Sequence, residues 1–207
     1  MNYKDLSKEH LDAHVTRLIE IAESIQPHEV TILTGGNALG KSVIRKILAN
    51  SLKKKLGATD PTKLVAAISM QARTESRPEF GGLSTMMHDL PWSSTSESTI
   101  HCIKQVIRLK ERFIVIDELE IGMSKEVQMG MCLYINTLIP EILENNYGLL
   151  VITHSDVVVK TVKHDKFINI EGMNEDEWLS REIVPVNPED VSEWALELFK
   201  TIRDRSK

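Results

Sequence analysis

The sequence predicts an α/β fold with a largely parallel central sheet. Short apolar runs of strand length alternate with amphipathic segments through the middle of the chain, as expected when helices cover a parallel sheet. The length of 207 residues, with 42% hydrophobic and 27% charged residues, suits one globular domain with a buried core. We therefore expect residues 1–207 to form a single domain.

Apolar residues at steps of three and four positions predict the helices. In the first helix, Leu11, Val15, Leu18 and Ala22 recur at this spacing after Ser7, a residue type that often caps a helix. The second closes with three lysines before a glycine, which favours a helix C-terminus. The predicted helices span residues 7–25, 42–56, 100–109, 124–145, 156–163 and 188–203.

Short runs rich in β-branched and other apolar residues predict the strands. Most of these runs are apolar almost throughout, which is typical of strands covered on both faces of a sheet. Between about residues 72 and 98 the pattern gives way to serine, threonine, glycine, proline and histidine, so we expect an irregular insertion there. The predicted strands are 30–34, 64–70, 113–116, 149–153, 167–170 and 183–186.

Composition excludes several classes of protein. With 25 Lys and Arg against 30 Asp and Glu, the formal charge is -5, which does not support nucleic-acid binding driven by charge alone. Cys102 and Cys132 stand apart in apolar surroundings, so we expect two buried thiols rather than a disulfide or a zinc site. No run approaches the length of a membrane span. We expect no membrane insertion and a cytoplasmic location.

A glycine loop at residues 35–42 is the most specific motif. It fits the pattern G-x-x-x-x-G-K-[ST] and lies between a predicted strand and a predicted helix. Backbone N–H groups and a helix N-terminus converge on phosphate in such a loop, with the lysine adding charge and the serine hydroxyl binding Mg²⁺. The other reading is an ordinary glycine turn. The loop consists of Gly35, Gly36, Asn37, Ala38, Leu39, Gly40, Lys41 and Ser42.

Polar residues also follow three other predicted strands. Asp117 and Glu118 end the strand 113–116, where carboxylates can bind Mg²⁺ and polarise an attacking water. His154 follows the strand 149–153 and can hydrogen-bond a phosphate or the water that attacks it. Gln71 follows the strand 64–70. The alternatives are solvated acids at a strand end and a structural histidine, and the joint placement favours a site.

In order along the chain, the glycine loop, Gln71, the Asp117-Glu118 pair and His154 resemble the core of ABC-type ATPases. The resemblance covers roughly residues 30–155 and implies a three-layer P-loop NTPase fold with a reduced helical insertion, in a minimal relative that is not a transporter. It implies that the glycine loop is the Walker A motif and binds ATP, that Mg²⁺ is held by Ser42, Asp117 and Gln71, and that Glu118 and His154 are catalytic. The resemblance also implies that Gln71 contacts the nucleotide.

The chain departs from the family pattern at several places. Residues 93–98 occupy the place of the family's signature sequence but differ from its usual residues. Ser94 and Ser96, at a helix start, can still bind the phosphate of a partner subunit's ATP. Ser94 and Glu97 also fit an ordinary capping box. Ala38 replaces a usual glycine, and only Tyr3 precedes the loop as an aromatic candidate for stacking on adenine.

The resemblance leads us to expect ATP hydrolysis by an ATP-dependent homodimer that switches an unidentified protein partner. One alternative is a small-molecule or nucleotide kinase, with Arg73 and Arg77 in a lid. Another is a nucleotide-binding regulatory subunit with little turnover. Basic groups at 53–55 and 108–112 fit solvated helix ends better than nucleic-acid contacts.

Overall fold

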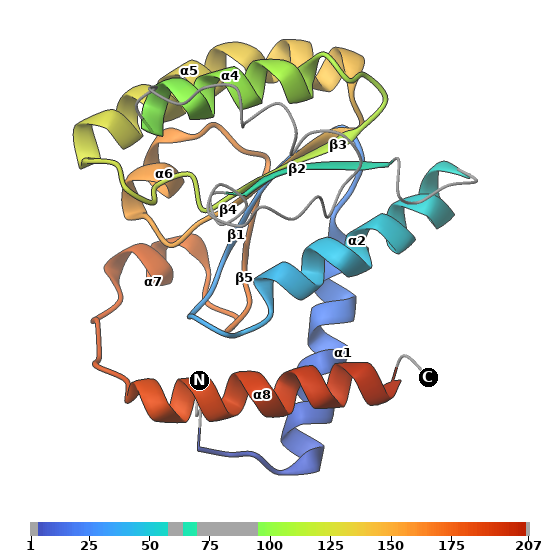
Figure 1. Ribbon diagram of the computed structural model, residues 1–207, viewed down its shortest axis with the longest axis vertical. Coiled ribbons are helices and arrows are strands. Elements are labelled where there is room, and N and C mark those ends of the chain that lie inside the picture. The colour runs from blue at the N-terminus through green and yellow to red at the C-terminus, as the bar shows by residue number, and fades with distance from the viewer. Residues whose placement is uncertain (1–3, 58–63, 70–94, 206–207) are drawn as a thin grey trace.

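The computed structural model describes residues 4–57, 64–69 and 95–205. It confirms an α/β architecture with a five-stranded sheet in the order β2-β3-β4-β1-β5, in which every neighbouring pair is parallel (Figure 1). The strands are β1 (Val30–Thr34), β2 (Val65–Ser69), β3 (Phe113–Asp117), β4 (Gly148–Ile152) and β5 (Lys166–Asn169).

Helices cover both faces of this sheet. On one face α4, α5, α6 and α7 bury the apolar side chains that β1, β2, β3 and β4 direct to that side. On the other face α1 and α2 pack on a second cluster. The helices are α1 (Lys8–Ser24), α2 (Lys41–Leu56), α4 (Thr95–Ile107), α5 (Lys125–Asn145), α6 (Asp156–Thr161), α7 (Glu175–Ser180) and α8 (Pro188–Arg205).

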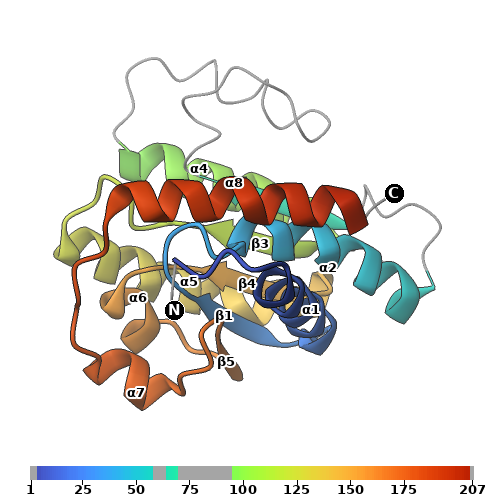
Figure 2. The same ribbon diagram turned by 90° about the horizontal axis from the view of Figure 1, so that it is seen from below.

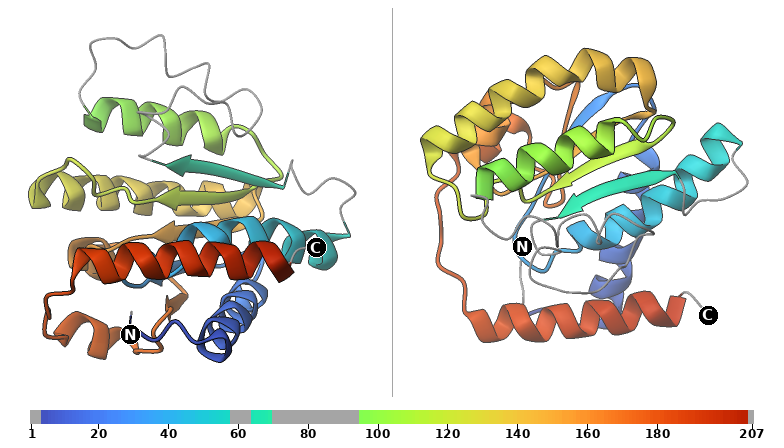
Figure 3. Two further views of the ribbon diagram at one scale, coloured as in Figure 1. Left: turned by 60° about the horizontal axis from the view of Figure 1, so that its bottom comes forward. Right: turned by 45° about the horizontal axis from the view of Figure 1, so that its top comes forward.

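The last helix, α8, lies outside these layers and crosses α1, as Figure 2 and Figure 3 show from two sides. Trp194 and Leu198 of α8 pack on Leu11 and Val15 of α1 in a small core of their own. Trp194 is fully buried there. This packing holds α8 against α1.

Most predicted elements are confirmed to within a few residues. Ser7 caps α1 by accepting a hydrogen bond from the backbone N of His10, as its residue type suggests. Cys102 and Cys132 are buried free thiols, and burial raises the pKa of Cys132 to about 12. No helix within the described ranges combines the length and the apolar character needed to cross a membrane.

Three predictions about elements are wrong in part or entirely. Residues 183–186 form no strand: Ile183 is 86% exposed in the connection between α7 and α8, and strand propensity has no effect without a neighbouring strand to pair with. Helix α6 ends at Thr161, before the predicted end at 163. The irregular insertion, predicted to reach about 98, ends earlier because α4 begins at Thr95; its residues 72–94 lie outside the described ranges.

One helix was not predicted. Asn174 and Glu177 form a capping box at the start of α7, in which each side chain accepts from the other residue's backbone N. The pattern N-x-x-E is visible in the sequence and was a usable signal. The helix carries Trp178, whose burial against Phe167 fixes this short element to the sheet.

Candidate functional site

Three of the sequence motifs meet at one edge of the sheet. The central strands β3, β4 and β1 are neighbours and parallel, so their carboxyl ends lie together. The register pairs Ile152 with Asp117 on one side and with Leu33 on the other. The glycine loop, the Asp117-Glu118 pair and His154 therefore leave the sheet at the same level.

The glycine loop turns sharply into α2. Gly40 has a φ of 96°, and a Cβ atom at this position would lie 2.6 Å from Cδ1 of Leu18 in α1. Both facts require glycine. Helix α2 begins at the next residue. Because the N-cap residue Gly40 has no side chain to accept hydrogen bonds from the first N–H groups of the helix, these groups stay available on the side of the loop.

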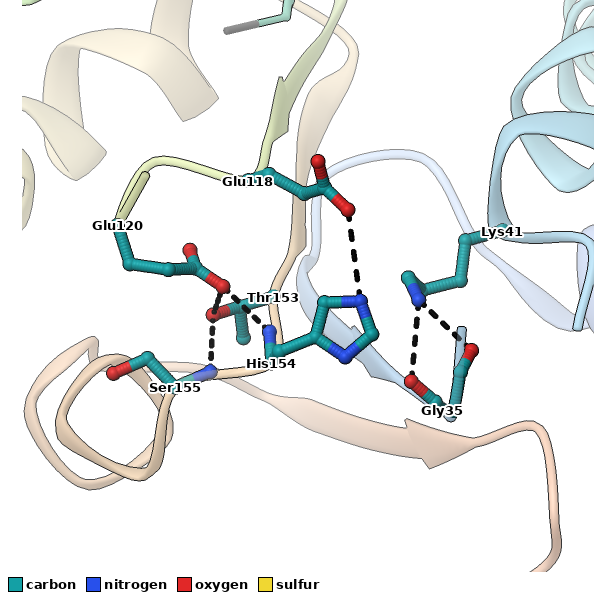
Figure 4. Close-up of polar contacts among 8 residues, drawn as sticks. Gly35, Lys41, Glu118, Glu120, Thr153, His154 and Ser155 are labelled. Atoms are coloured by element: carbon teal, nitrogen blue, oxygen red, sulfur yellow. Dashed lines mark hydrogen bonds and ion pairs between the residues drawn. The ribbon is translucent and has the colours of Figure 1, made fainter. Parts of the chain in front are cut away.

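The ammonium group of Lys41 is buried within this loop. Its Nζ donates to the carbonyl oxygens of Gly35 and Gly36, both at 3.1 Å, and the residue is 7% exposed (Figure 4). Burial lowers the pKa of Lys41, and the nearby carboxylates of Glu118 and Asp117 act against that change. The loop thus surrounds a cation that lies within electrostatic influence of Asp117 and Glu118 at the end of β3.

The loop is also held from outside the sheet. Nε2 of His14, in α1, donates to the carbonyl oxygen of Leu39 at 2.9 Å, and Leu39 is fully buried. The His14 ring packs edge-on against Trp194 of α8, with ring centroids 5.4 Å apart. Burial lowers the pKa of His14. No sequence signal separates this histidine from an ordinary core residue, and it was missed.

Asp117, the last residue of β3, is a buried carboxylate. Its Oδ2 lies 3.7 Å from Nη1 of Arg45, one helical turn beyond Lys41 in α2. Burial raises the pKa of Asp117 to about 6, against the influence of Arg45, and the charge of Glu118 adds to the increase. Burial makes the ionised form of this carboxyl group costly, and a cation beside it would stabilise that form.

Glu118 leaves the strand in a left-handed conformation, with a φ of 55°. Its backbone N still donates to the carbonyl oxygen of Ile152, at 2.9 Å. The side chain turns toward His154, and the distance between Oε1 of Glu118 and Nε2 of His154 is 3.5 Å (Figure 4). Strained backbone of this kind is concentrated at functional sites.

Glu120, which is not among the predicted site residues, connects the turns after β3 and β4. Its Oε1 accepts hydrogen bonds from Oγ1 of Thr153 at 2.8 Å and from the backbone N of His154 at 2.6 Å. A glutamate two positions beyond a strand end has no recognisable pattern. Only the packing of the two turns gives it this contact.

The remaining predicted residues are less informative. Asn37 and Ser42 are exposed at the loop surface, and Ala38 has a left-handed φ of 61°. Gln71 and Ser94 lie outside the described residues, as does Tyr3. Ser96 belongs to the first turn of α4, but its side chain is not among those described.

The donor groups present fit Mg²⁺ bound together with phosphate. In the described part of the chain, no group of three or more His, Cys, Asp and Glu side chains is placed to hold a metal by itself. Mg²⁺ is commonly bound by one or two protein oxygens, with phosphate and water completing its six ligands. The Asp117 carboxylate and the Ser42 hydroxyl supply oxygen donors of this kind.

Comparison with known proteins assigns no family. No protein-family model matches the chain, and no curated protein matches it. Function is therefore inferred from the residues at the carboxyl edge of the sheet.

Proposed function

We propose that this chain is a Mg²⁺-dependent P-loop ATPase of the ABC-like type. One observation carries the proposal: the buried ammonium of Lys41, held in the glycine loop after β1, lies within electrostatic influence of the carboxylates of Asp117 and Glu118 at the end of β3, two strands away in the sheet. A cation in a turn at a helix N-terminus suits the phosphates of a nucleotide. Carboxylates beside it suit the metal and the water of hydrolysis.

Binding would use the loop and the start of α2. The N–H groups of the turn would donate hydrogen bonds to the phosphate oxygens, and Lys41 would exchange its two carbonyl contacts for phosphate. Ser42 and Asp117 would hold Mg²⁺, with Gln71 as the further ligand that the resemblance implies. When bound, Mg²⁺ neutralises phosphate charge and orients the terminal phosphate.

Hydrolysis would depend on the pair formed by Glu118 and His154. A carboxylate at the end of β3 can polarise a water and take its proton as that water attacks the γ-phosphate. The imidazole, 3.5 Å from the carboxylate, is placed to contact the same phosphate or water. This arrangement favours attack by water over transfer to a bound alcohol, which is the specific reason to prefer an ATPase to a kinase.

The same proposal extends to a homodimer that closes around ATP. The resemblance supports this step, with Ser94 and Ser96 of a second copy completing each site, and the parallel sheet with helices on both faces is compatible with it. Hydrolysis would then open the dimer and switch a protein partner.

The deciding experiment is release of phosphate from Mg-ATP with no acceptor present. Wild-type protein should release phosphate, and Lys41→Met should abolish the release because the loop loses its cation. Lys53→Met is the matched control, since Lys53 is exposed in the last turn of the same helix. Silence of the wild type with ATP binding intact would favour a regulatory subunit, and phosphate transfer only when an acceptor is added would favour a kinase.

A further inference from the structure

Glu120 accepts two hydrogen bonds at the site, although it is not among the predicted site residues. It lies in the turn between β3 and α5, and a single oxygen, Oε1, receives two donors from consecutive residues of the next turn, Oγ1 of Thr153 and the backbone N of His154 (Figure 4). Hydrogen bonds to a carboxylate are short and roughly twice as strong as those between neutral groups.

These contacts fix the main chain at His154. Thr153 is fully buried, and its backbone N donates to the carbonyl oxygen of Leu33 in β1. Its hydroxyl donates to Glu120 and accepts from the backbone N of Ser155 at 2.9 Å. Glu120 thus holds 153–155 directly or through one hydroxyl, and the direction of the His154 side chain is set by that backbone.

A second bridge joins the same two turns. Oγ of Ser155 donates to Oε1 of Gln128 at 2.7 Å, and Nε2 of Gln128 donates to the carbonyl oxygen of Met123 at 3.0 Å. The turn that carries Glu118 and the turn that carries His154 are therefore tied at two places.

The hydrogen-bonding capacity of the Glu120 carboxylate is only partly used within the described part of the structure. Its second oxygen, Oε2, is buried and has no hydrogen-bond partner within the described part of the structure. Leaving a carboxylate oxygen buried and unsatisfied costs stability. Departures of this kind from the best local choice are expected where a residue serves a site.

We propose that Glu120 is a positioning residue for His154, which it holds by the backbone so that the imidazole faces Glu118. The role in turnover rests on the proposed ATPase function. The contact itself does not, because the hold on the turn exists without nucleotide.

The test compares Glu120→Ala with Glu120→Gln. The amide oxygen of glutamine can accept both donors, whereas alanine accepts neither. For Glu120→Ala we expect kcat for ATP hydrolysis to fall about tenfold or more, the scale found for groups that orient a reacting residue. KM for ATP should stay within about threefold of the wild-type value, because Glu120 contacts the turn that carries His154 and not the glycine loop that would bind the phosphates. Glu120→Gln should recover most of kcat.

A second measurement works without turnover. Hydrogen exchange at the backbone N–H of His154 should accelerate about tenfold in Glu120→Ala, as expected for loss of one charged hydrogen bond, and should stay near wild type in Glu120→Gln. Glu141→Ala, an exposed glutamate on α5, is the control for both readouts. If Glu120→Ala does not fold, Thr153→Val against Thr153→Ser compares the loss and the retention of the hydroxyl contact with Glu120, and a smaller effect in the same direction is expected.

The outcomes separate the two proposals. Unchanged kcat in Glu120→Ala, or equal losses in the alanine and glutamine variants with unchanged exchange at His154, would overturn the positioning role. A wild type without hydrolysis would count against the ATPase instead. Exchange at His154 would then still decide whether Glu120 holds this turn.

Discussion

Nε2 of His154 lies 3.5 Å from Oε1 of Glu118, across the carboxyl ends of two adjacent parallel strands. The register that pairs Asp117 with Ile152 brings the two side chains to the same level. A carboxylate and an imidazole this close together can act as a pair of acid–base groups on the same proton. The chemistry of the site should therefore be sensitive to either residue.

Glu118→Gln should stop turnover without stopping binding. The amide keeps the shape of the side chain but cannot take a proton from water, so kcat should fall about a hundredfold or more while ATP affinity is retained. Size-exclusion chromatography with and without ATP provides a second readout, because slow hydrolysis should trap the ATP-dependent dimer.

Two results would contradict this prediction. Near wild-type phosphate release by Glu118→Gln would remove Glu118 from catalysis. Identical elution of the variant with and without ATP would argue against the dimer while leaving the ATPase itself in place. Glu126→Gln is a suitable control, since this glutamate is exposed in the first turn of α5.

Asp117→Asn should stabilise the protein at pH 7 and weaken Mg²⁺ binding. Burial raises the pKa of Asp117 from 3.8 to about 6, so the folded state holds a proton that the unfolded state releases. The stability that this gives is full below pH 3.8 and is lost as the pH rises through about 6. A difference of about two pH units corresponds to at most about 3 kcal/mol, and loss of the ion pair with Arg45 reduces the gain.

Urea unfolding at several pH values checks the sign. Wild-type stability should contain a component that decreases from pH 3.8 to about 6, and Asp117→Asn should lack it. Asp204→Asn, at an exposed position of α8, should follow the wild type. A variant that is less stable than the wild type at pH 7 would show that the ion pair outweighs the cost of burial.

Most of the fold could be predicted because its signals are local. The runs 30–34, 113–116 and 149–153 are apolar enough to be buried strands, and the strands of a parallel sheet send their carboxyl ends to one edge. Those two facts were sufficient to expect Lys41, Glu118 and His154 near one another before the structure was known.

The rest depended on contacts between segments distant in sequence. The run 183–186 has strand propensity, but pairing decides whether a strand forms. His14 and Glu120 act through hydrogen bonds to Leu39 and His154, and nothing in their sequence neighbourhood marks those partners. Contacts of this kind follow from how helices and turns pack.

Gly40→Ala should destabilise the protein, and Gly130→Ala should stabilise it. A φ of 96° strains any residue with a side chain, and the added Cβ would meet Leu18, so we expect a loss of about 2 kcal/mol or more at Gly40. Gly130 lies inside α5 with no atom within 4 Å of an added Cβ, and alanine there should add about 1 kcal/mol. Chemical denaturation of both variants measures the difference, and equal effects would refute the account of the loop.

His14→Leu should weaken ATP binding although His14 lies in α1, outside the glycine loop. Leucine cannot donate to the carbonyl oxygen of Leu39, and leaving this buried acceptor without its donor costs about 1–3 kcal/mol. The loop should become less ordered, so ATP should bind more weakly and unfolding should become easier. His14→Gln can still donate through its side-chain amide and should recover part of both.

The pH dependence separates the hydrogen bond from simple packing. Burial lowers the pKa of His14 below 6.5, so the wild type loses stability as the pH falls through that lowered value, because the unfolded state takes up the proton first. His14→Gln should lack this loss at acid pH while recovering part of the ATP affinity at neutral pH. If His14→Leu binds ATP as the wild type does, the contact between α1 and the loop only stabilises the fold.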